Sequence, residues 1–360
     1  MPVLHINYQP AMTARLAAAG AFAKSPLVVV DVGARGGAET HWRAFGAGVR
    51  IIAFEADAQE CARLNALPRQ GNVAYICRAL SRAGGAQRFH VAAHASSSSL
   101  YPNGPHASRF TFGDALRVVS EETLETVTLA EALRAAGVPG FDFIKLDVEG
   151  AELDVLQGAG GLIDGALGFV CEVRFTAELS GCPVFADVER FARERRFGLY
   201  DLDVYRYSRT ALPYPLLYDF RDREGRPVAG PATQGQAIRG DALYLRDALK
   251  ERLEDSQLVK LACLYEIYGL NDCAAELIRA FPASFENHAE LLELLTLPVK
   301  GERLAYQEYV ERYQRSDPLF RPTYGRRWPE EIVAQYDGVF TPPWRRLGAR
   351  LLRRLLRRRS

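Results

Sequence analysis

The sequence is poor in cysteine, in long apolar runs and in net charge, and each shortage excludes a class of protein. Its 360 residues include six cysteines, with no C-x-x-C pair and no histidine at zinc-ligand spacing. So few cysteines cannot form a disulfide framework, and we expect reduced thiols in a cytoplasmic protein. No run of about 18 apolar residues occurs, so no membrane-spanning helix is expected. The first residues carry no secretory signal pattern.

The net charge of +1 conceals an uneven distribution. Residues 345–360 hold eight arginines and no acidic residue, and the rest of the chain has 37 basic against 44 acidic residues, a net charge of −7. This balance argues against nucleic acid as a partner. The leucines of the tail recur at i, i+4, i+5, i+8 and i+9, which predicts a basic amphipathic helix on an anionic membrane surface. Docking on a protein and a solvated tail are the alternatives.

Short apolar runs alternate with helical patterns between residues 26 and 247. Runs such as 27–31 and 49–54 lack polar alternation, as strands buried on both faces do, and helical spacing follows at 58–67 and 129–136. The expected fold class is therefore α/β, with a Rossmann-like, doubly wound and mostly parallel sheet. The expected strands are 27–31, 49–54, 73–77, 89–92, 141–147, 169–173 and 242–245.

The same patterns divide the chain into four segments. An alanine-rich leader at 1–25 is expected to form a helix, and 26–247 is expected to form the α/β domain. Beyond it only helical spacing remains, which predicts a C-terminal helical region at 248–343. The basic amphipathic tail occupies 344–360.

A glycine loop follows the first expected strand, in the run Asp31-Val32-Gly33-Ala34-Arg35-Gly36-Gly37. Glycines let a backbone approach a ligand closely, and ligands of open α/β sheets bind at the carboxyl ends of the strands. Glu55 ends the next strand, where a carboxylate can accept hydrogen bonds from both hydroxyls of a ribose. These features predict a nucleoside-binding site, and a plain glycine turn is the alternative.

The loop also discriminates among nucleoside cofactors. Arg35 stands at the second glycine position of G-x-G-x-x-G, so the dinucleotide fingerprint is absent and a nicotinamide-dependent oxidoreductase is disfavoured. An acidic residue at the start of the loop suits a cationic ligand instead. S-adenosylmethionine carries an amino group and a sulfonium, and Asp31 is expected to face that end of it.

The run Lys145-Leu146-Asp147-Val148-Glu149-Gly150-Ala151-Glu152 is the most specific motif of the chain. With the glycine loop, with Phe54-Glu55-Ala56-Asp57 and with Ala79-Leu80-Ser81, it makes residues 27–245 resemble the FkbM-type family of S-adenosylmethionine-dependent methyltransferases. The resemblance implies a fold of the class I methyltransferase type. It also implies O-methylation, often of sugar hydroxyls in natural products or surface glycans.

The resemblance implies a cofactor site residue by residue. Glu55 is implied at the ribose, and Ala79 with Leu80 at the adenine. The sequence departs from the commonest family form at Arg35, where asparagine is frequent, and at Ala56, where proline is frequent. The implied cofactor-binding residues are Asp31, Gly33, Ala34, Arg35, Gly37, Glu55, Ala56, Ala79, Leu80 and Asp147.

Methyl transfer to a hydroxyl, a poor nucleophile, calls for in-line alignment and a general base. The catalytic candidates are Lys145, Asp147, Glu149 and Glu172, which lie at or near the ends of two expected strands. Converging carboxylates can raise the pKa of one of them or bind a divalent cation, although no dedicated oxygen-ligand loop is present and no metal is expected. Glu152 opens a helix, where it either joins the site or complements the helix dipole.

Other polar residues have weaker claims. Residues 96–113 form a long serine-containing loop, a candidate lid, and His90, His94 and His106 around it are candidate bases. His41 is expected to be a partly exposed surface residue. The tyrosines of 200–207, with Tyr214 and Tyr218, are candidates for stacking on sugars, although packing of the late strands is the preferred interpretation.

The sequence thus predicts an S-adenosylmethionine-dependent O-methyltransferase that acts on a sugar of a glycan, glycolipid or natural product. The alternative is a non-catalytic nucleoside-binding module that organises a glycan-assembly complex. The expected partner is a saccharide or lipid-linked saccharide. The expected location is cytoplasmic, and peripheral on the inner membrane face where the tail binds it.

Overall fold

The computed structural model describes residues 5–68, 72–110, 112–207, 209–211, 220–221, 227–228 and 235–296. The chain divides into two compact units, 1–296 and 297–360, and the described residues all belong to the first. The end of the expected helical region, 297–343, and the expected tail, 344–360, lie outside the described residues.

A seven-stranded sheet is the centre of the first unit, in the order β3-β2-β1-β7-β8-β12-β9. The first five strands in this order run parallel, whereas β12 pairs antiparallel with both β8 and β9. This sheet confirms the predicted Rossmann-like, mostly parallel fold. The strands are β1 (Leu27–Val32), β2 (Val49–Glu55), β3 (Val73–Cys77), β7 (Phe143–Leu146), β8 (Gly168–Arg174), β9 (Gly198–Tyr207) and β12 (Gln236–Leu245).

Helices cover both faces of this sheet because alternate strand residues enter two separate cores. One core joins α1 (Ala11–Ala18), the 3-10 helix η1 (Thr40–Gly48) and α7 (Asp255–Ile267) to one face, which we call the α7 face. The other core joins α4 (Leu129–Ala135) and α5 (Glu152–Gly158) to the opposite face, together with α6 (Phe185–Glu194). The remaining helix of this layer system is α2 (Ala58–Ala66), between β2 and β3.

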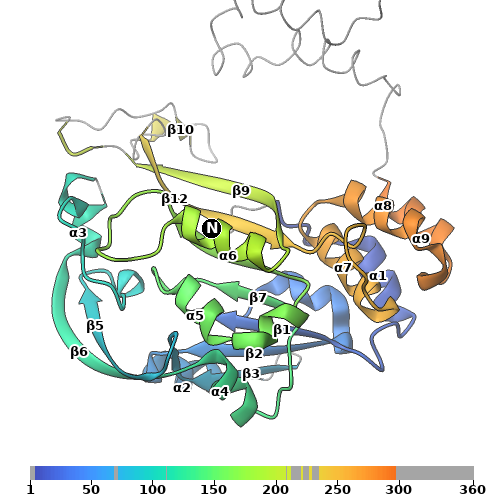
Figure 1. Cartoon of the computed structure of the whole chain (residues 1–360), viewed down its shortest axis with the longest axis horizontal. Helices are drawn as coiled ribbons and strands as arrows, with labels where there is room; N and C mark the ends of the chain where they lie inside the picture. The colour runs from blue at the N-terminus through green and yellow to red at the C-terminus, as the bar shows by residue number, and fades with distance from the viewer. Residues whose placement is uncertain are drawn as a thin grey trace, which may run out of the picture. The chain divides into compact units, whose positions relative to one another are not determined.

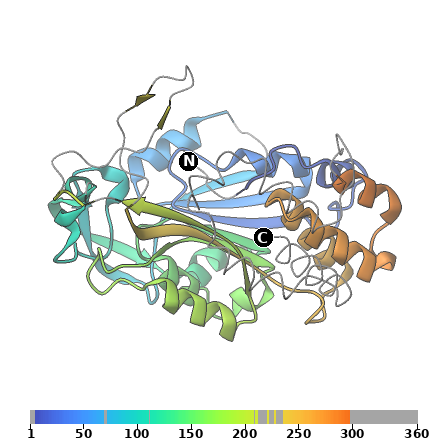
Figure 2. The same cartoon turned by 90° about the horizontal axis from the view of Figure 1, so that it is seen from above.

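A second sheet, of three strands, stands at the end of the unit opposite α7 (Figures 1 and 2). Its order is β4-β6-β5, and β6 is a strand that the sequence analysis missed because most of its side chains are exposed. Beside it lies the short helix α3 (Gly113–Leu116). The strands are β4 (Ala79–Leu80), β5 (Gly85–Ala92) and β6 (Val118–Val127), and a separate pair is β10 (Phe220–Arg221) and β11 (Pro227–Val228).

The helices after residue 247 share the core of the main sheet. The Lys260 ammonium on α7 lies 2.9 Å from the Asp142 carboxylate just before β7. The Glu266 carboxylate on α7 accepts hydrogen bonds from the amides of Met12 and Thr13 in the first turn of α1. These contacts join α7 to the sheet and α1 to α7. Two further helices follow, α8 (Asn271–Ala280) and α9 (His288–Leu295).

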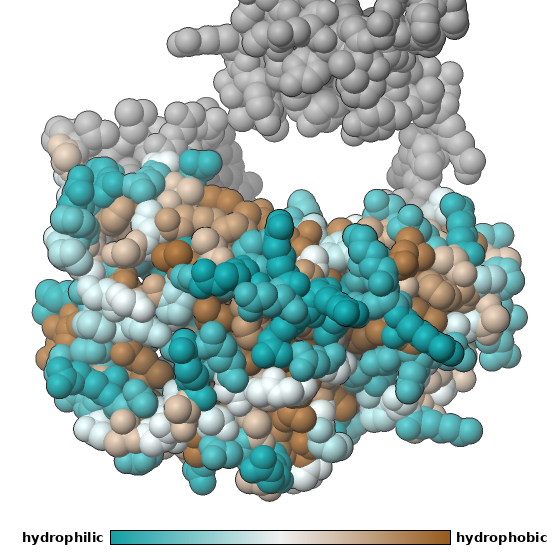
Figure 3. Space-filling model, in the orientation of Figure 1, coloured by the Kyte–Doolittle hydropathy of each residue, from teal (hydrophilic) through white to brown (hydrophobic). Residues whose placement is uncertain are grey.

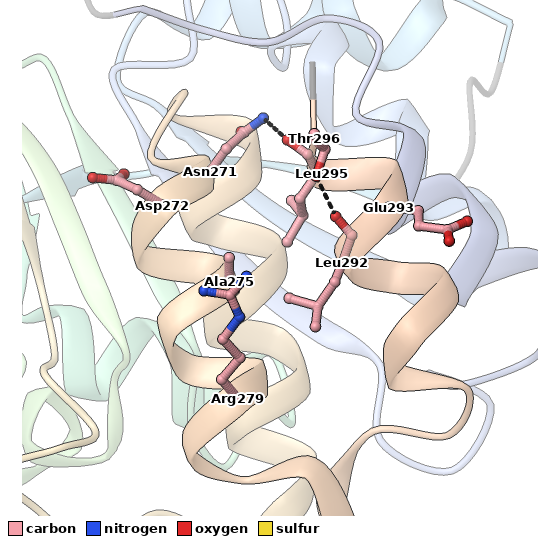
Figure 4. Close-up of a pocket in the computed structure, with 8 residues that line it drawn as sticks. All are labelled: Asn271, Asp272, Ala275, Arg279, Leu292, Glu293, Leu295 and Thr296. Carbon is pink, nitrogen blue, oxygen red and sulfur yellow. Dashed lines mark hydrogen bonds between the residues drawn. The ribbon is translucent and has the colours of Figure 1, made fainter. Parts of the chain in front are cut away.

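The surface offers no membrane-spanning element within the described ranges, because no helix there is long and apolar enough to cross a bilayer. Hydrophilic side chains gather over α6, near the centre of the view in Figure 3. A pocket of about 290 Å³ opens between α8 and α9, where Asn271 donates a hydrogen bond to the Leu295 carbonyl (Figure 4). The residues that line this pocket all come from α8, α9 and the residue after α9, so none belongs to the carboxyl end of a parallel strand.

Candidate active site

The glycine loop closes tightly over the end of β7. Gly33 has a φ of 82°, and a Cβ at this position would collide with the Asp147 carbonyl oxygen. The amides of Gly33 and Ala34 both donate to the carbonyl of Phe54 on β2, at 3.0 and 3.1 Å. The loop therefore joins the ends of three parallel strands, and only glycine fits at its first turn.

Glu55 and Arg35 belong to one network at the start of α2. The amide of Asp57 donates to the Glu55 carboxylate at 2.8 Å, and burial raises the pKa of Glu55. Asp57 caps α2 and lies 2.7 Å from the Arg35 guanidinium, while Glu60 accepts the amide of Gly36 at 2.8 Å. Arg35 thus ties the glycine loop to α2.

The remaining cofactor candidates lie around this network. Gly37, with a φ of 103°, leaves room for the Tyr75 hydroxyl, which accepts a hydrogen bond from the Ala38 amide. Tyr75 was missed by the sequence analysis. Ala79 and Leu80 come one residue after the end of β3 and form β4 of the three-stranded sheet, where both are buried. Ala56 is exposed.

Lys145 connects two of the predicted carboxylates. Its ammonium lies 3.4 Å from Asp31 and 3.6 Å from Asp147, and it donates to the Gly33 carbonyl at 3.2 Å. Burial by itself would lower the pKa of Lys145. The nearby carboxylates of Asp31, Asp147 and Glu39 have the larger effect together, so the pKa of Lys145 is raised. Burial also raises the pKa of Asp31, whereas the Asp147 side chain is 55% exposed. A buried acid, a charged lysine and an accessible carboxylate therefore meet at the glycine loop.

Glu149 and Glu172 lie in a neighbouring ionic group, which we call the arginine cluster. Arg174 is 1% exposed and lies 2.8 Å from Glu149 and 2.7 Å from Glu172. Arg239 lies 3.2 Å from Glu149 and 3.0 Å from Glu178. Four carboxyl groups therefore face two guanidinium groups. The cluster consists of Arg174 and Arg239 with Glu149, Glu152, Glu172 and Glu178.

Glu149 combines strain with a shifted acidity. Its φ is 52°, which is uncommon for a residue other than glycine, and its carbonyl accepts the Ser99 hydroxyl at 2.6 Å. Burial and the nearby Glu172 raise the pKa of Glu149 above its usual range, despite the two arginines. A buried carboxyl with a raised pKa at a strand end has the properties of a general base.

Glu152 does more than complement the dipole of the helix that it opens, which was one of its two expected roles. Its carboxylate accepts the backbone amides of Val148 and Gly150, at 3.0 and 3.0–3.1 Å. It therefore closes the turn that carries Glu149. Burial raises the pKa of Glu152 as well.

The sequence analysis missed the arginine partners of these carboxylates. Arg174 lies two residues after Glu172 on the same strand, so period-two alternation would have placed both on one face. Arg239 pairs with Arg174 across β8 and β12, and this long-range pairing has no local signal in the sequence.

The weaker histidine candidates separate by environment. His41 was expected at the surface, but its side chain is only 3% exposed. Burial lowers its pKa to about 4. Its interpretation as partly exposed was wrong because η1 packs its aromatic side chains between the sheet and α7. His90 is buried, and its ring nitrogen Nδ1 lies 3.1 Å from the Glu121 carboxylate. His94 and His106 are exposed.

Hydrogen bonds hold the serine loop, residues 96–113, against the segments that carry the arginine cluster. Tyr101 donates to Asp154 at 2.5 Å, and the Gly104 amide donates to the Glu178 carbonyl at 2.7 Å. Of the tyrosine candidates, Tyr200 is bonded to Tyr265 of α7 at 2.8 Å, as expected from packing. Tyr214 and Tyr218 lie outside the described residues.

Comparison with known proteins identifies the domain that contains these residues. A methyltransferase FkbM domain matches residues 31–199, which include every catalytic candidate. The chain contains an FkbM methyltransferase domain. Residues 31–199 thereby belong to the FkbM methyltransferases, a family that depends on S-adenosylmethionine.

Solved methyltransferase structures show only distant similarity to the FkbM chain. The fibrillarin/Nop5p complex has 14% identity and a TM-score of 0.31, over 61% of this chain and 73% of that one. Magnesium protoporphyrin IX methyltransferase from Synechocystis PCC 6803 has 10% identity and a TM-score of 0.28, over 67% and 80%. A SAM-dependent methyltransferase from Agrobacterium tumefaciens has 14% and 0.30, over 67% and 62%. No curated protein matches the sequence.

The residues present fit S-adenosylmethionine. The glycine loop lies beside the buried Asp31, and the buried Glu55 stands at the end of the next strand, where a carboxylate can accept from ribose hydroxyls. Within the described ranges no group of three or more histidine, cysteine or acidic side chains has the arrangement of a metal site. When bound, S-adenosylmethionine would supply an electrophilic methyl group at this edge of the sheet.

Proposed function

We propose that this FkbM protein transfers the methyl group of S-adenosylmethionine to a hydroxyl oxygen of a sugar, on a glycan, a glycolipid or a natural product. The observation that carries the proposal is the position of Glu149. Its carboxyl has a raised pKa and lies in the turn directly after Asp147, which Lys145 joins to the glycine loop. A hydroxyl acceptor needs such a base close to the methyl donor.

Each candidate has a separate task in this reaction. Glu149 takes the hydroxyl proton while the oxygen bonds to the methyl carbon and the carbon–sulfur bond breaks, which leaves a methyl ether and S-adenosylhomocysteine. Lys145 fixes Asp147 and the loop carbonyl of Gly33, and thereby the alignment of donor and acceptor. Glu172 keeps the pKa of Glu149 raised.

Two measurements test the proposal. Calorimetry should detect binding of S-adenosylmethionine but not of NAD, and Glu55→Ala should weaken that binding about tenfold or more because the ribose loses its acceptor. A labelled methyl donor should then label a sugar acceptor, with Glu149→Gln at least about a hundredfold slower. Cofactor binding without transfer to any acceptor would instead favour the non-catalytic nucleoside-binding module.

The proposed location follows from the tail. Eight arginines and five leucines at helical spacing support a cytoplasmic protein that lies on the inner membrane face, close to lipid-linked saccharides. Flotation with anionic vesicles should recover the full chain but not a chain that ends at residue 344. Equal recovery of the two proteins would refute the membrane role.

A further inference from the structure

His41 is buried and has no hydrogen-bond partner among the described residues. It is the second residue of η1, four residues after Gly37 of the glycine loop, and it is 3% exposed. Neither of its ring nitrogens, Nδ1 and Nε2, forms a hydrogen bond with the described part of the chain. Buried polar side chains are nearly always hydrogen-bonded, so a histidine with two unpaired nitrogens points to a polar ligand or water.

Three aromatic rings surround the imidazole of His41. The ring centroids of Trp42, Tyr268 and Tyr8 lie 4.3, 6.1 and 6.3 Å from that of the imidazole. Trp42 and Tyr268 are buried, whereas Tyr8, in the segment before α1, is 52% exposed. Of these three rings only that of Tyr8 reaches solvent, so a movement of Tyr8 opens the imidazole to a ligand.

This aromatic group covers the sheet face that carries Asp31 and Lys145. Trp42 and Tyr268 pack on Phe143 of β7, with ring centroids 5.6 and 5.5 Å apart. Phe143 and Lys145 lie two residues apart on this strand, so they point to the same face, and Lys145 pairs with Asp31 of β1. The Oδ1 atom of Asp31 is likewise buried and accepts no hydrogen bond from a described residue. The α7 face therefore holds two buried polar side chains with unpaired atoms close to the glycine loop.

The chemistry around His41 favours a ligand with hydroxyl groups. Burial lowers the pKa of His41 to about 4, so near pH 7 the imidazole is neutral, with one donor and one acceptor nitrogen. A hydroxyl both donates and accepts, so it can pair with either nitrogen, whereas a carboxylate can pair only with the donor. A carboxylate would also add negative charge on the face that carries Asp31. Aromatic walls with a few polar groups are typical of small-molecule sites, and a sugar ring offers hydroxyls together with apolar C–H groups.

We propose that His41 binds a hydroxyl of the sugar acceptor, with the Tyr8 ring as the movable wall of this subsite. The inference rests on the proposed function and adds two acceptor-binding residues to it. An imidazole with a pKa of about 4 is a weak base at pH 7, so the hydroxyl proton remains the task of Glu149. His41 therefore contributes to the affinity for the acceptor, and its loss should appear in KM.

The kinetic test compares two variants of His41, with methyl hexosides as probes and a labelled methyl donor. His41→Phe keeps an aromatic ring but removes both nitrogens, so KM for the hexoside should rise about tenfold while kcat stays within about threefold. His41→Gln keeps a donor and an acceptor and should recover most of this loss. Tyr8→Ala removes the movable wall and should also raise KM. The affinity for S-adenosylmethionine should stay within about twofold in all three variants.

Nuclear magnetic resonance can observe the contact without turnover. The chain has six histidines, and in protein with isotope-labelled histidine the ring signals of His41 are those that disappear in His41→Phe. Hexoside added together with S-adenosylhomocysteine should shift these signals, because a new hydrogen bond changes the environment of the ring nitrogens. The signals of His288, which is exposed on α9, should not move.

Melting temperatures separate this role from a structural one. Unpaired buried nitrogens cost solvation free energy that a phenylalanine ring does not, so His41→Phe should raise the melting temperature while it raises KM. A histidine that supports the fold through a buried water would lose that contact, and the melting temperature would fall. Tyr265→Phe is the matched structural control: it removes a hydroxyl bonded to Tyr200 and to the Arg246 carbonyl, and should lower the melting temperature without changing KM. His288→Gln should change neither.

The outcomes distinguish this inference from the proposed function. Transfer to hexosides with an unchanged KM in His41→Phe, or unshifted His41 signals at saturating hexoside, would overturn the inference and leave the proposed function intact. A lower melting temperature of His41→Phe with an unchanged KM would show a structural histidine. An equal rise of KM in His41→Phe and His41→Gln would refute hydrogen bonding as the cause. No transfer to any hexoside by the wild type would overturn the proposed function and the inference with it.

Discussion

Replacement of Lys145 by methionine tests the electrostatic design of the site. Lys145→Met keeps the length of the side chain but removes the charge that lies 3.4 Å from Asp31. The Asp31 side chain is 5% exposed, so its carboxylate is left buried without a counter-charge. Breaking a buried pair on one side costs about 3–5 kcal/mol. Lys145 is 21% exposed, so we expect the lower end, about 3 kcal/mol at pH 7.

The loss should depend on pH in a defined direction. Without Lys145 the folded-state pKa of Asp31, already raised by burial, rises further. An acid with a raised folded-state pKa destabilises the protein above its unfolded pKa, and this penalty disappears as the pH falls and the acid takes up its proton. The difference in unfolding free energy between wild type and Lys145→Met should therefore shrink between pH 7 and pH 4.

Urea denaturation at several pH values measures this difference. Lys250→Met is the matched control, because Lys250 lies 2.7 Å from Asp247 but is 82% exposed, and such surface pairs contribute about 0–1 kcal/mol. The double variant Lys145→Met/Asp31→Asn should regain most of the free energy of unfolding that Lys145→Met loses. A loss that is independent of pH, or equal to that of the surface control, would refute the argument that Asp31 is the group left uncompensated.

Three further predictions follow from individual contacts. Gly33→Ala should abolish binding of S-adenosylmethionine in calorimetry, because its Cβ collides with the Asp147 carbonyl; Gly36→Ala, whose Cβ meets no atom within 4 Å, should reduce binding less. Thr128→Ala should lower the free energy of unfolding by about 1 kcal/mol, because Thr128 caps α4; an unchanged urea midpoint would contradict this. The rate of methyl transfer should fall as the pH drops through the raised pKa of Glu149, since only the ionised carboxyl accepts a proton; a flat profile from pH 6 to 9 would exclude Glu149 as the base.

The positions of the cofactor candidates in the fold were largely predictable because their signals are local. Asp31, Gly33 and Gly37 lie in seven consecutive residues, and the β-branched run before them marks the strand end on which they stand. Glu55 follows the next such run. Since parallel strands end at one edge of the sheet, their terminal residues meet wherever the pattern of strands is clear.

The acceptor half was only partly predictable. Glu149 and Glu172 were correctly chosen as neighbours, but their arginine partners were missed, since Arg239 reaches Glu149 from a strand 90 residues later.

The sequence by itself determined the fold class, the position of the glycine loop and the acidic strand ends, because hydrophobic periodicity and glycine geometry act over a few residues. The tertiary structure alone decided which charges are paired and which stay available. Antiparallel pairing of β12 with β8 and β9 brings Asp241, Glu172 and Asp203 side by side, and α7 brings Tyr268 to the same face. Pairing between distant strands follows from the packing of the whole sheet, and no local pattern encodes it.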